Sequence, residues 1–300
     1  MHILEIDSVS KFYREVTAVD DISLNIPKNS IFGLLGPNGA GKTSLIRMIT
    51  QITGIDEGKI LFDGEPLKPH HTAQIGYMPE ERGLYKKMKI GEQLVYLARL
   101  KDLSKAEAKS RILHWLERFQ IEDWWNKKVE DLSKGMQQKV QFISTVMHQP
   151  KLLILDEPFS GLDPINATLI REEIFRMVKE DGISVIFSTH RMEQVEEICE
   201  RIALIHNGKR ILSGEVADLK QQFKKNEYAL ITNSPLNSLT SKYNVEQLKR
   251  GEHLFHLKED QHATQLIKDL LQEQVEIRSF SEVLPGMNEI FIEQVQSNTL

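Results

Sequence analysis

The segment Gly36–Thr43, with the sequence GPNGAGKT, limits what this chain can fold into more than any other part of it. Its glycines allow the backbone to turn sharply and to bring N–H groups close to an anion, and its lysine adds a positive charge. The apolar run Ile31–Leu35 before it predicts a strand, and Ser44–Gln51 after it predicts a helix. A glycine-rich loop between a strand and a helix, ending in Lys-Thr, is typical of loops that hold nucleotide phosphates.

We expect the whole loop and the first residue after it to contact the nucleotide. A cation such as Lys42 is unfavourable at a helix N-terminus unless an anion binds there too. The hydroxyl of Thr43 would bind the Mg²⁺ ion that bridges the outer phosphates. The alternative is a glycine-rich turn that caps a helix, but a chance match in this strand-to-helix context is rare. The expected contact residues are Gly36, Pro37, Asn38, Gly39, Ala40, Gly41, Lys42, Thr43 and Ser44.

Composition indicates an ordinary globular chain. Its 300 residues can bury a substantial core, in one large domain or in a domain with an appendage. There is no run of eighteen apolar residues and no basic-then-apolar leader, so we expect the chain to stay in the cytosol. The net charge of −5 lacks the basic footprint that nucleic-acid binding requires. The single cysteine, Cys199, precludes an internal disulfide, and its apolar neighbours favour a buried thiol.

Hydrophobic patterns predict an α/β core with a helical insertion. Residues 1 to about 83 alternate strand-like and turn-like segments, which predicts one sheet with one early helix. Helical spacing of apolar residues indicates an insertion at about 84–150. Continuous apolar runs at Leu152–Leu155 and Ile183–Phe187 then predict buried parallel strands. The strands expected before the insertion are Ile3–Ile6, Ala18–Ile26, Ile31–Leu35, Lys59–Phe62 and Ile75–Met78.

A smaller second domain is expected after about residue 215. A polar helix at about 215–225 leads away from the first domain, and the remaining residues predict a small α+β unit. The expected domains are therefore 1–215 and 216–300. The clearest element of the second is a helix with one apolar face, formed by Ala263, Leu266, Ile267, Leu270 and Leu271.

Two adjacent carboxylates end the buried strand in Leu152-Leu-Ile-Leu-Asp-Glu-Pro158. This is the edge at which open α/β sheets bind ligands. Because adjacent strand residues point in opposite directions, we expect Asp156 to face a Mg²⁺ ion and Glu157 to face the water that attacks the γ-phosphate. A solvated Asp-Glu-Pro turn is the alternative, which the phosphate loop in the same chain disfavours.

A helix with a capped start is predicted to begin within Leu132-Ser-Lys-Gly-Met-Gln-Gln138. Ser133 suits the N-cap position, and a capped helix start alone would explain the segment. The hydroxyl of Ser133, the small residue Gly135 and the helix dipole could also form a second anion site, to which Lys134 adds positive charge.

These segments occur in the order and context typical of the ATP-binding subunits of ABC transporters. The resemblance is carried by the phosphate loop, the Ser133 segment, the strand that ends in Asp156 and Glu157, Ser160-Gly-Leu-Asp-Pro164 and Ser188-Thr-His190. It covers residues 1 to about 215 and implies a P-loop NTPase core of the ABC type. It also implies an ATPase that uses ATP and Mg²⁺, pairs with a second ABC subunit and drives a separate transmembrane permease.

The resemblance further implies roles for single residues. Tyr13 matches the aromatic residue that stacks on adenine, a contact of about 1–3 kcal/mol per base. His190 matches the switch histidine that contacts the γ-phosphate, and together with Glu157 and Lys42 it would act in catalysis. The loop with Asp163 would cross to the partner subunit, while its Asp-Pro pair also suits an N-cap followed by the first helical residue. By themselves, Tyr13 and His190 would be ordinary residues at strand ends.

Two departures from the family pattern affect the site. Glu80 stands where most of the family has the glutamine of the Q-loop, so its carboxylate can reach Mg²⁺ or water but adds negative charge near the phosphates. A simple charged loop at residues 80–82 is the alternative. The Ser133 segment reads Leu-Ser-Lys-Gly-Met instead of Leu-Ser-Gly-Gly-Gln, which is similar to the sodium- and drug-exporter branch. The C-terminal unit, ending in Met287-Asn-Glu-Ile-Phe-Ile292, resembles a small domain often appended in that branch.

The leading hypothesis is therefore an exporter subunit whose two copies close head to tail over ATP. It would lie at the inner face of the membrane, with its permease docked between the helical insertion and the Glu80 loop. A soluble ABC ATPase of DNA repair or translation is one alternative, but the long coiled-coil insertion or second cassette of such proteins is missing. A weakly hydrolysing regulator is the other alternative; Glu80 keeps it open, and the set of Asp156, Glu157 and His190 argues against it.

Histidines and tryptophans give weaker signals. The pair His70 and His71 and the scattered His253, His256 and His262 lack the Cys or carboxylate partners of a structural metal site, so none is predicted. The tryptophans are expected in the core of the helical insertion or at its edge, where an exposed one could help to dock a partner; they are Trp115, Trp124 and Trp125.

Overall fold

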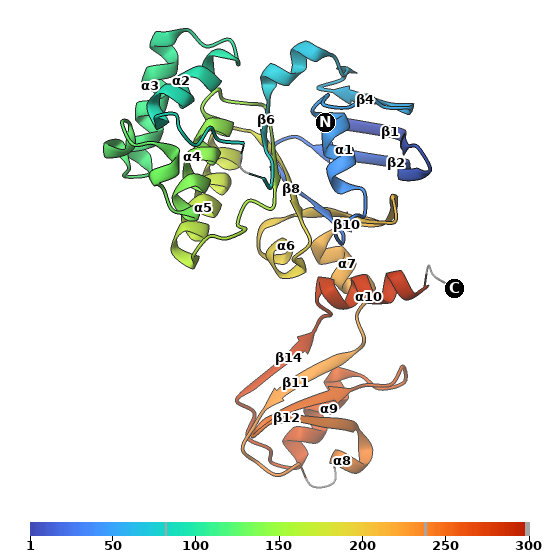
Figure 1. Cartoon of the computed structure of the whole chain (residues 1–300). Helices are drawn as coiled ribbons and strands as arrows, with labels where there is room; N and C mark the ends of the chain where they lie inside the picture. Colours follow the sequence, from blue (N-terminus) through green and yellow to red (C-terminus); the bar gives the residue numbers. More distant parts are fainter. Residues whose placement is uncertain (82, 237–238, 298–300) are drawn as a thin grey trace. The chain divides into compact units, whose positions relative to one another are not determined.

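The structure is a computed structural model that describes residues 1–81, 83–236 and 239–297 (Figure 1). The chain divides into two compact units, of which the first contains Met1–Glu215 and the second Val216–Gln296. Among the residues that the structure describes, no helix is both long enough and apolar enough to cross a membrane.

Six strands of the first unit form a mostly parallel sheet in the order β10-β9-β3-β8-β7-β6. Its central strands β3, β7 and β8 are fully buried, because helices or a second sheet cover both faces. This confirms the buried parallel strands expected from the apolar runs. The strand bounds are Ile31–Leu35 (β3), Ile75–Met78 (β6), Leu152–Asp156 (β7), Ser184–Thr189 (β8), Arg201–His206 (β9) and Lys209–Glu215 (β10).

The early strands do not join one sheet, as the sequence patterns predicted, but divide between two. Strand β1 pairs antiparallel with both β2 and β4, whereas β3 and β6 pair with strands from much later in the chain. The antiparallel sheet has the order β2-β1-β4-β5. Its strands are His2–Tyr13 (β1), Val16–Pro27 (β2), Glu57–Phe62 (β4) and Glu65–Pro66 (β5).

Helix α1, Lys42–Ile49, contributes to a core that the two sheets share. Its buried residues Leu45, Ile46 and Met48 belong to the same apolar cluster as Ile6 of β1 and Leu34 of β3. The helix begins at Lys42 instead of at the expected Ser44, because Gly41 with φ 110° serves as its N-cap. It ends at Ile49, two residues before Gln51, which has a left-handed φ of 59°.

The helical insertion packs as a group of α-helices and short 3₁₀ segments, drawn in green at one side of the first unit in Figure 1. Trp115 is buried in its core, with its ring centroid 6.2 Å from that of Phe142, while Trp124 and Trp125 are half-buried. The α-helices of the first unit other than α1 are Ile90–Arg99 (α2), Lys105–Arg118 (α3), Lys134–Val146 (α4), Pro164–Glu180 (α5) and Met192–Ile198 (α6). The 3₁₀ segments are Pro69–Gln74, Glu122–Trp124 and Val129–Asp131.

The second unit is built around an antiparallel sheet in the order β12-β13-β11-β14. Helix α9, Ala263–Gln272, covers the apolar core of this sheet through Leu266 and Leu270. The remaining elements are Val216–Gln222 (α7), Glu227–Ile231 (β11), Leu239–Lys242 (α8), Asn244–Lys249 (β12), Glu252–His256 (β13), Ser279–Val283 (β14) and Met287–Ser297 (α10).

One residue on the expected apolar face of α9 was assigned wrongly. Leu271 is 61% exposed, whereas Asp269, which the pattern leaves out, is buried. The carboxylate of Asp269 accepts hydrogen bonds from the Tyr243 hydroxyl at 2.6 Å and from the Gln265 amide at 2.8 Å, and it forms an ion pair with Lys242. These partners satisfy the carboxylate, so it can occupy a position that hydrophobicity alone would give to an apolar side chain.

Candidate nucleotide-binding site

The glycine-rich loop between β3 and α1 has a backbone that only glycine adopts readily. Gly36, Gly39 and Gly41 have φ angles of 147°, 80° and 110°. A Cβ atom on Gly36 would lie 2.1 Å from the carbonyl oxygen of Ile205, and one on Gly41 would lie 2.3 Å from that of Ala18. A Cβ atom on Gly39 would meet nothing within 4 Å. Two glycines are therefore required by the packing of the loop, and the third borders open space.

Lys42 brings a buried positive charge to this loop. Its ammonium group donates hydrogen bonds to the carbonyl oxygens of Gly36, at 2.6 Å, and of Pro37, at 3.0 Å. Burial lowers the pKa of Lys42, and the negative charges of Asp156, Glu157 and Glu80 oppose this shift. In the described part of the chain no carboxylate forms an ion pair with it, so the ammonium can receive an anion such as a phosphate.

A cavity of about 510 Å³ lies over the loop. The loop lines it with seven of the nine expected residues, and three expected carboxylates join them. Its volume falls in the range of small-molecule and cofactor sites. The expected residues in its wall are Asn38, Gly39, Ala40, Gly41, Lys42, Thr43, Ser44, Glu80, Asp156 and Glu157.

The two adjacent carboxylates at the end of β7 accept hydrogen bonds from the end of β8 and from His190, which follows it. Ser188, which is paired in register with Asp156, donates a hydrogen bond of 2.7 Å to its carboxylate. Glu157 accepts hydrogen bonds from the backbone N–H of His190 at 2.8 Å and from the Thr189 hydroxyl at 3.1 Å. The His190 Nδ1 atom lies 2.5 Å from the same carboxylate. Burial raises the pKa of Asp156, and the Ser188 hydrogen bond and Lys42 oppose that shift.

The expectation that Asp156 and Glu157 point in opposite directions is wrong. Strand β7 ends at Asp156, and Glu157 has a φ of 50°, outside the extended region. The alternation of side chains in a strand therefore does not continue to Glu157. As a result, both residues line the same cavity.

Three other expected residues gather elsewhere, at the starts of α4 and α5. Ser133 is the N-cap of α4 and accepts a hydrogen bond from the N–H of Met136, and Asp163 is the N-cap of α5. A Cβ atom on Gly135 would lie 3.9 Å from the Asp163 carboxylate, which brings the two helix starts together. Ser133, Gly135 and Asp163 do not line the cavity over the phosphate loop.

Tyr13, Gly36, Pro37 and His190 also lie outside the cavity wall. Tyr13 ends β1 and is 38% exposed, with the Lys11 ammonium 5.5 Å from its ring centroid. Gly36 and Pro37 support Lys42 through their carbonyl groups, and His190 contacts Glu157.

Five residues of the cavity wall were not expected from the sequence: Val16, Thr17, Ala18, Asn207 and Gly208. Asn207 and Gly208, with φ angles of 48° and 77°, turn the chain between β9 and β10. The N–H of Gly208 donates to the Ala40 carbonyl at 2.9 Å, which joins this turn to the phosphate loop. An Asn-Gly pair between two strand-like runs is a recognised hairpin signal, but the sequence does not indicate which loop the hairpin will meet.

A second group of side chains corrects an expectation about metals. His70 and His71 do have a carboxylate neighbour, since ligand atoms of Glu65, His70 and His71 lie within 4.8 Å of one another. However, His71 Nδ1 accepts a hydrogen bond from the Lys68 N–H, so the neutral ring carries its proton on Nε2. That proton faces Glu65, where a metal would need a lone pair. The group is therefore arranged as an ordinary polar contact between a histidine and a carboxylate.

Comparison with known proteins agrees with this geometry. Residues 19–160 match the family model of the ABC transporter, and residues 214–295 match that of the ATP-binding protein DrrA1-3-like, C-terminal domain. The chain is 48% identical to the uncharacterized ABC transporter ATP-binding protein YhaQ of Bacillus subtilis, over 98% of each chain. It is 34% identical to the linearmycin resistance ATP-binding protein LnrL of the same organism, over 78% of this chain and 76% of that one.

Among solved structures, the ATP-binding subunit of an ABC transporter is similar with a TM-score of 0.68 and 31% identity, covering 74% of this chain and 93% of that one. The fold and the glycine-rich loop between β3 and α1 define a P-loop ATPase. The chain belongs to the ATP-binding proteins of ABC transporters, and its C-terminal region belongs to the DrrA-like type. This agrees with the family that the sequence motifs indicated.

Proposed function

We propose that this chain is the ATP-hydrolysing subunit of an ABC exporter and that two copies close head to tail over ATP. The observation that carries the proposal is the separation of two groups of residues. The phosphate loop, Asp156 and Glu157 line one cavity, whereas Ser133, Gly135 and Asp163 gather outside it. Each group would form half of a site, which the other half of a second copy would complete.

The start of α4 suits this second half. Ser133 is exposed, and its hydroxyl and the free N–H groups of the first helical turn can donate to an anion. A Cβ atom on Gly135 would make only ordinary contacts within its own chain, the shortest being 3.6 Å to Leu162. Nothing in its own chain therefore requires glycine there, and close approach of a phosphate from another copy gives a reason for it.

Within the cavity, we assign the reacting roles to the following residues. Lys42 and the loop N–H groups would bind the phosphates, and Thr43, Asp156 and Glu80 would bind Mg²⁺. When bound, Mg²⁺ would neutralise charge on the outer phosphates. Glu157 would orient and polarise the attacking water, and His190 would contact the γ-phosphate. Tyr13 would stack on adenine from the edge of the site, and Asp163 would reach the partner copy.

A separate membrane permease would use the motion of the two copies. Tyr85, Tyr96 and Leu100 are 53%, 45% and 62% exposed, which makes an apolar surface on the helical insertion and the segment that precedes it. That surface supports docking of the permease beside the Glu80 loop, at the inner face of the membrane. Export is supported by the resistance role in the name of LnrL. The domains would divide at 215 and 216, where the contacts of the chain also divide.

Glu157→Gln tests the closed dimer. The amide keeps the size of the side chain but removes its negative charge, so hydrolysis should slow while ATP still binds. The variant should form dimers in saturating Mg-ATP and remain monomeric in Mg-ADP, as measured by light scattering after size-exclusion chromatography. A monomer in both nucleotides would show that the head-to-tail proposal is wrong.

A further inference from the structure

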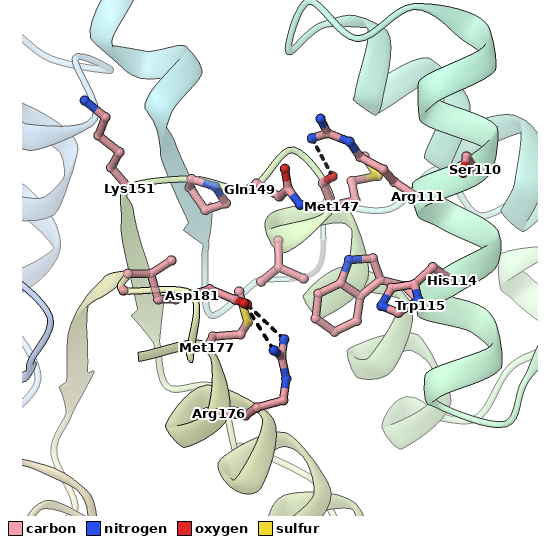
Figure 2. Close-up of a pocket in the computed structure, with 14 residues that line it drawn as sticks. Ser110, Arg111, His114, Trp115, Met147, Gln149, Lys151, Arg176, Met177 and Asp181 are labelled. Atoms are coloured by element: carbon pink, nitrogen blue, oxygen red, sulfur yellow. Dashed lines mark hydrogen bonds and ion pairs between the residues drawn. The ribbon is translucent and has the colours of Figure 1, made fainter. Parts of the chain in front are cut away.

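A second cavity, of about 710 Å³, lies in the first unit (Figure 2). It lies at the amino ends of the parallel strands, whereas the nucleotide site lies at their carboxyl ends. Its wall includes residues just before β7 and just before β8, at the amino ends of these strands. Asp156, Glu157 and His190 follow the carboxyl ends of the same strands. The two cavities share no residue, so the second cavity is not part of the ATP site.

Much of the wall of this second cavity is apolar. Trp115 of α3 contributes its indole ring, and Met147 and Met177 contribute thioether side chains from two other elements. Val146 and Ile183 add branched side chains. A volume of this size with such a lining suits an organic molecule with a flat or flexible apolar body, since thioethers adapt to ligand shape and contact aromatic rings favourably.

The charged side chains of the wall are not equally neutralised. Arg176 is fully paired, because it contacts the carboxylates of Glu173, Glu180 and Asp181. Lys151 lies 2.9 Å from Asp63, but Lys28 binds the same carboxylate at 2.5 Å. Two positive charges therefore share one negative charge. In Figure 2 the Lys151 ammonium points away from the space, so it is not placed to meet a ligand there.

In the described part of the chain no carboxylate forms an ion pair with Arg111, although its charge acts on Glu107 from a greater distance. Its guanidinium makes one long hydrogen bond, of 3.5 Å, to the carbonyl oxygen of Met147 at the end of α4. Glu107, one turn away on α3, is committed to the capping box with Ser104. In Figure 2, Arg111 and Lys151 lie on opposite sides of the space, with the Trp115 ring on the side of Arg111.

We propose that this cavity binds an amphipathic organic anion, whose apolar body packs against Trp115 and the two methionines and whose acidic group pairs with Arg111. Such a ligand would contact α3 of the helical insertion, the segment before β7 and the end of α5 at once. It would therefore connect the insertion to the α/β core at a distance from the ATP site.

The probe for the test is 8-anilinonaphthalene-1-sulfonate, an aromatic anion whose fluorescence rises in apolar surroundings. The full-length protein is titrated in saturating Mg-ADP, which keeps the probe out of the nucleotide site. We expect saturable binding that Arg111→Gln weakens about tenfold, because a charge-assisted hydrogen bond is lost. Lys109→Gln, on the same helix but outside the cavity wall, is the matched control and should bind the probe normally.

An uncharged probe of the same shape, N-phenyl-1-naphthylamine, separates the charge from the apolar wall. Its affinity should be the same in the parent protein and in Arg111→Gln. The proposal is overturned if the anionic probe shows no saturable binding, if Arg111→Gln binds it as tightly as the parent, or if both probes lose affinity to the same degree in Arg111→Gln.

Discussion

At the scale of single residues, the carboxylate of Glu157 is held in place by its two neighbours Thr189 and His190. The N–H and ring nitrogen of His190 and the hydroxyl of Thr189 contact it. A carboxylate has about four lone-pair positions, so these contacts leave room for about one more donor, such as a water. Thr189 and His190 can therefore orient Glu157, while its left-handed φ fixes the direction in which the side chain leaves the backbone.

Glu80 is the residue whose replacement should separate binding from chemistry. It lines the cavity and acts with Asp156 and Glu157 on the charge of Lys42. We expect Glu80→Gln to change kcat by about threefold to tenfold and the Kd for ATP by less than about twofold, since the charge lies beside the reacting phosphate and metal. Steady-state ATPase rates and nucleotide titration measure the two effects.

The neighbour Glu81 provides the control for this change. It is exposed and does not line the cavity, so Glu81→Gln should leave both quantities unchanged. Equal effects of Glu80→Gln on kcat and Kd, or no effect on either, would remove Glu80 from the site.

Single residues also show the limit of sequence patterns. Lys42, Thr43, Asp156 and Glu157 were found because their neighbours in the sequence are diagnostic. Asn207 was missed because its own neighbours indicate only a turn. It joins the cavity wall because β9 and β3 are neighbours in the parallel sheet, a pairing between segments about 170 residues apart in the chain.

At the scale of elements, the start of α4 can be tested without disturbing the fold. Gly135 is helical, and alanine is preferred to glycine in helices by about 0.5–1 kcal/mol, so Gly135→Ala should not lower the free energy of unfolding. If the glycine leaves room for a phosphate from a second copy, the same change should reduce ATPase turnover by about tenfold or more. Thermal unfolding and ATPase assays separate the two outcomes.

Gly54→Ala is the matched control for this substitution. A Cβ atom on Gly54 would meet nothing within 4 Å, and Gly54 does not line the cavity over the phosphate loop. A Gly135→Ala protein with the turnover of the Gly54→Ala protein would contradict the role proposed for the start of α4.

Asp269 of helix α9 allows a prediction about stability and pH. Hydrogen bonds from Lys242 and Tyr243 lower the pKa of Asp269 to about 2, below the ordinary value of 3.8. Because the folded pKa is the lower one, the stabilisation is complete above about pH 4 and is lost as pH falls through about 2. Asp269→Asn should lower the urea midpoint of the second unit at pH 7, and the difference from the parent should shrink between pH 4 and pH 2.

An exposed carboxylate of the same unit serves as the reference. Glu259→Gln should leave the urea midpoint unchanged at every pH, because Glu259 is exposed. A constant difference between Asp269→Asn and the parent from pH 7 to pH 2 would show that the ion pair and hydrogen bonds of Asp269 do not stabilise the unit.

Elements were predicted better than their partners. The strand patterns located β3, β7 and β8 closely, and the capping residues located the starts of α4 and α5, because period and capping residues are local properties. The division of the early strands into two sheets was missed, since an apolar pattern indicates a strand but not the strand with which it pairs. Only pairing with distant strands separates them.

At the scale of the whole molecule, a composite site predicts complementation between two inactive variants. Lys42→Ala destroys one half of the proposed site and Gly135→Ala the other, so each protein alone should have little ATPase activity. In a mixed dimer, the intact Lys42 of one copy would face the intact Gly135 of the other. A one-to-one mixture should recover about a quarter of the parent rate, because half of the dimers are mixed and each has one intact site of two.

The measurement compares the ATPase rate of the mixture with the sum of the separate rates. A Lys42→Ala, Glu157→Gln double variant provides the control. Mixed with Gly135→Ala protein it should restore the same activity, because the intact site takes both Lys42 and Glu157 from the Gly135→Ala copy. Mixed with Lys42→Ala protein it should restore none. A mixture no more active than the sum would mean that Lys42 and Gly135 do not act in one shared site.

The amino-acid sequence by itself determined the chemical class of this protein. Its phosphate loop, its paired carboxylates and its capped helix starts are short-range patterns, and short-range patterns are fixed by local backbone conformation and by the side chains within a few residues. The tertiary structure decided which of these groups share a cavity, where Glu157 points and which carboxylate reaches the histidine pair. It also formed the second cavity beside Arg111 and Trp115 from elements that no local pattern connects. These features depend on contacts between segments far apart in the chain, and such contacts exist only once the sheet and its helices have packed.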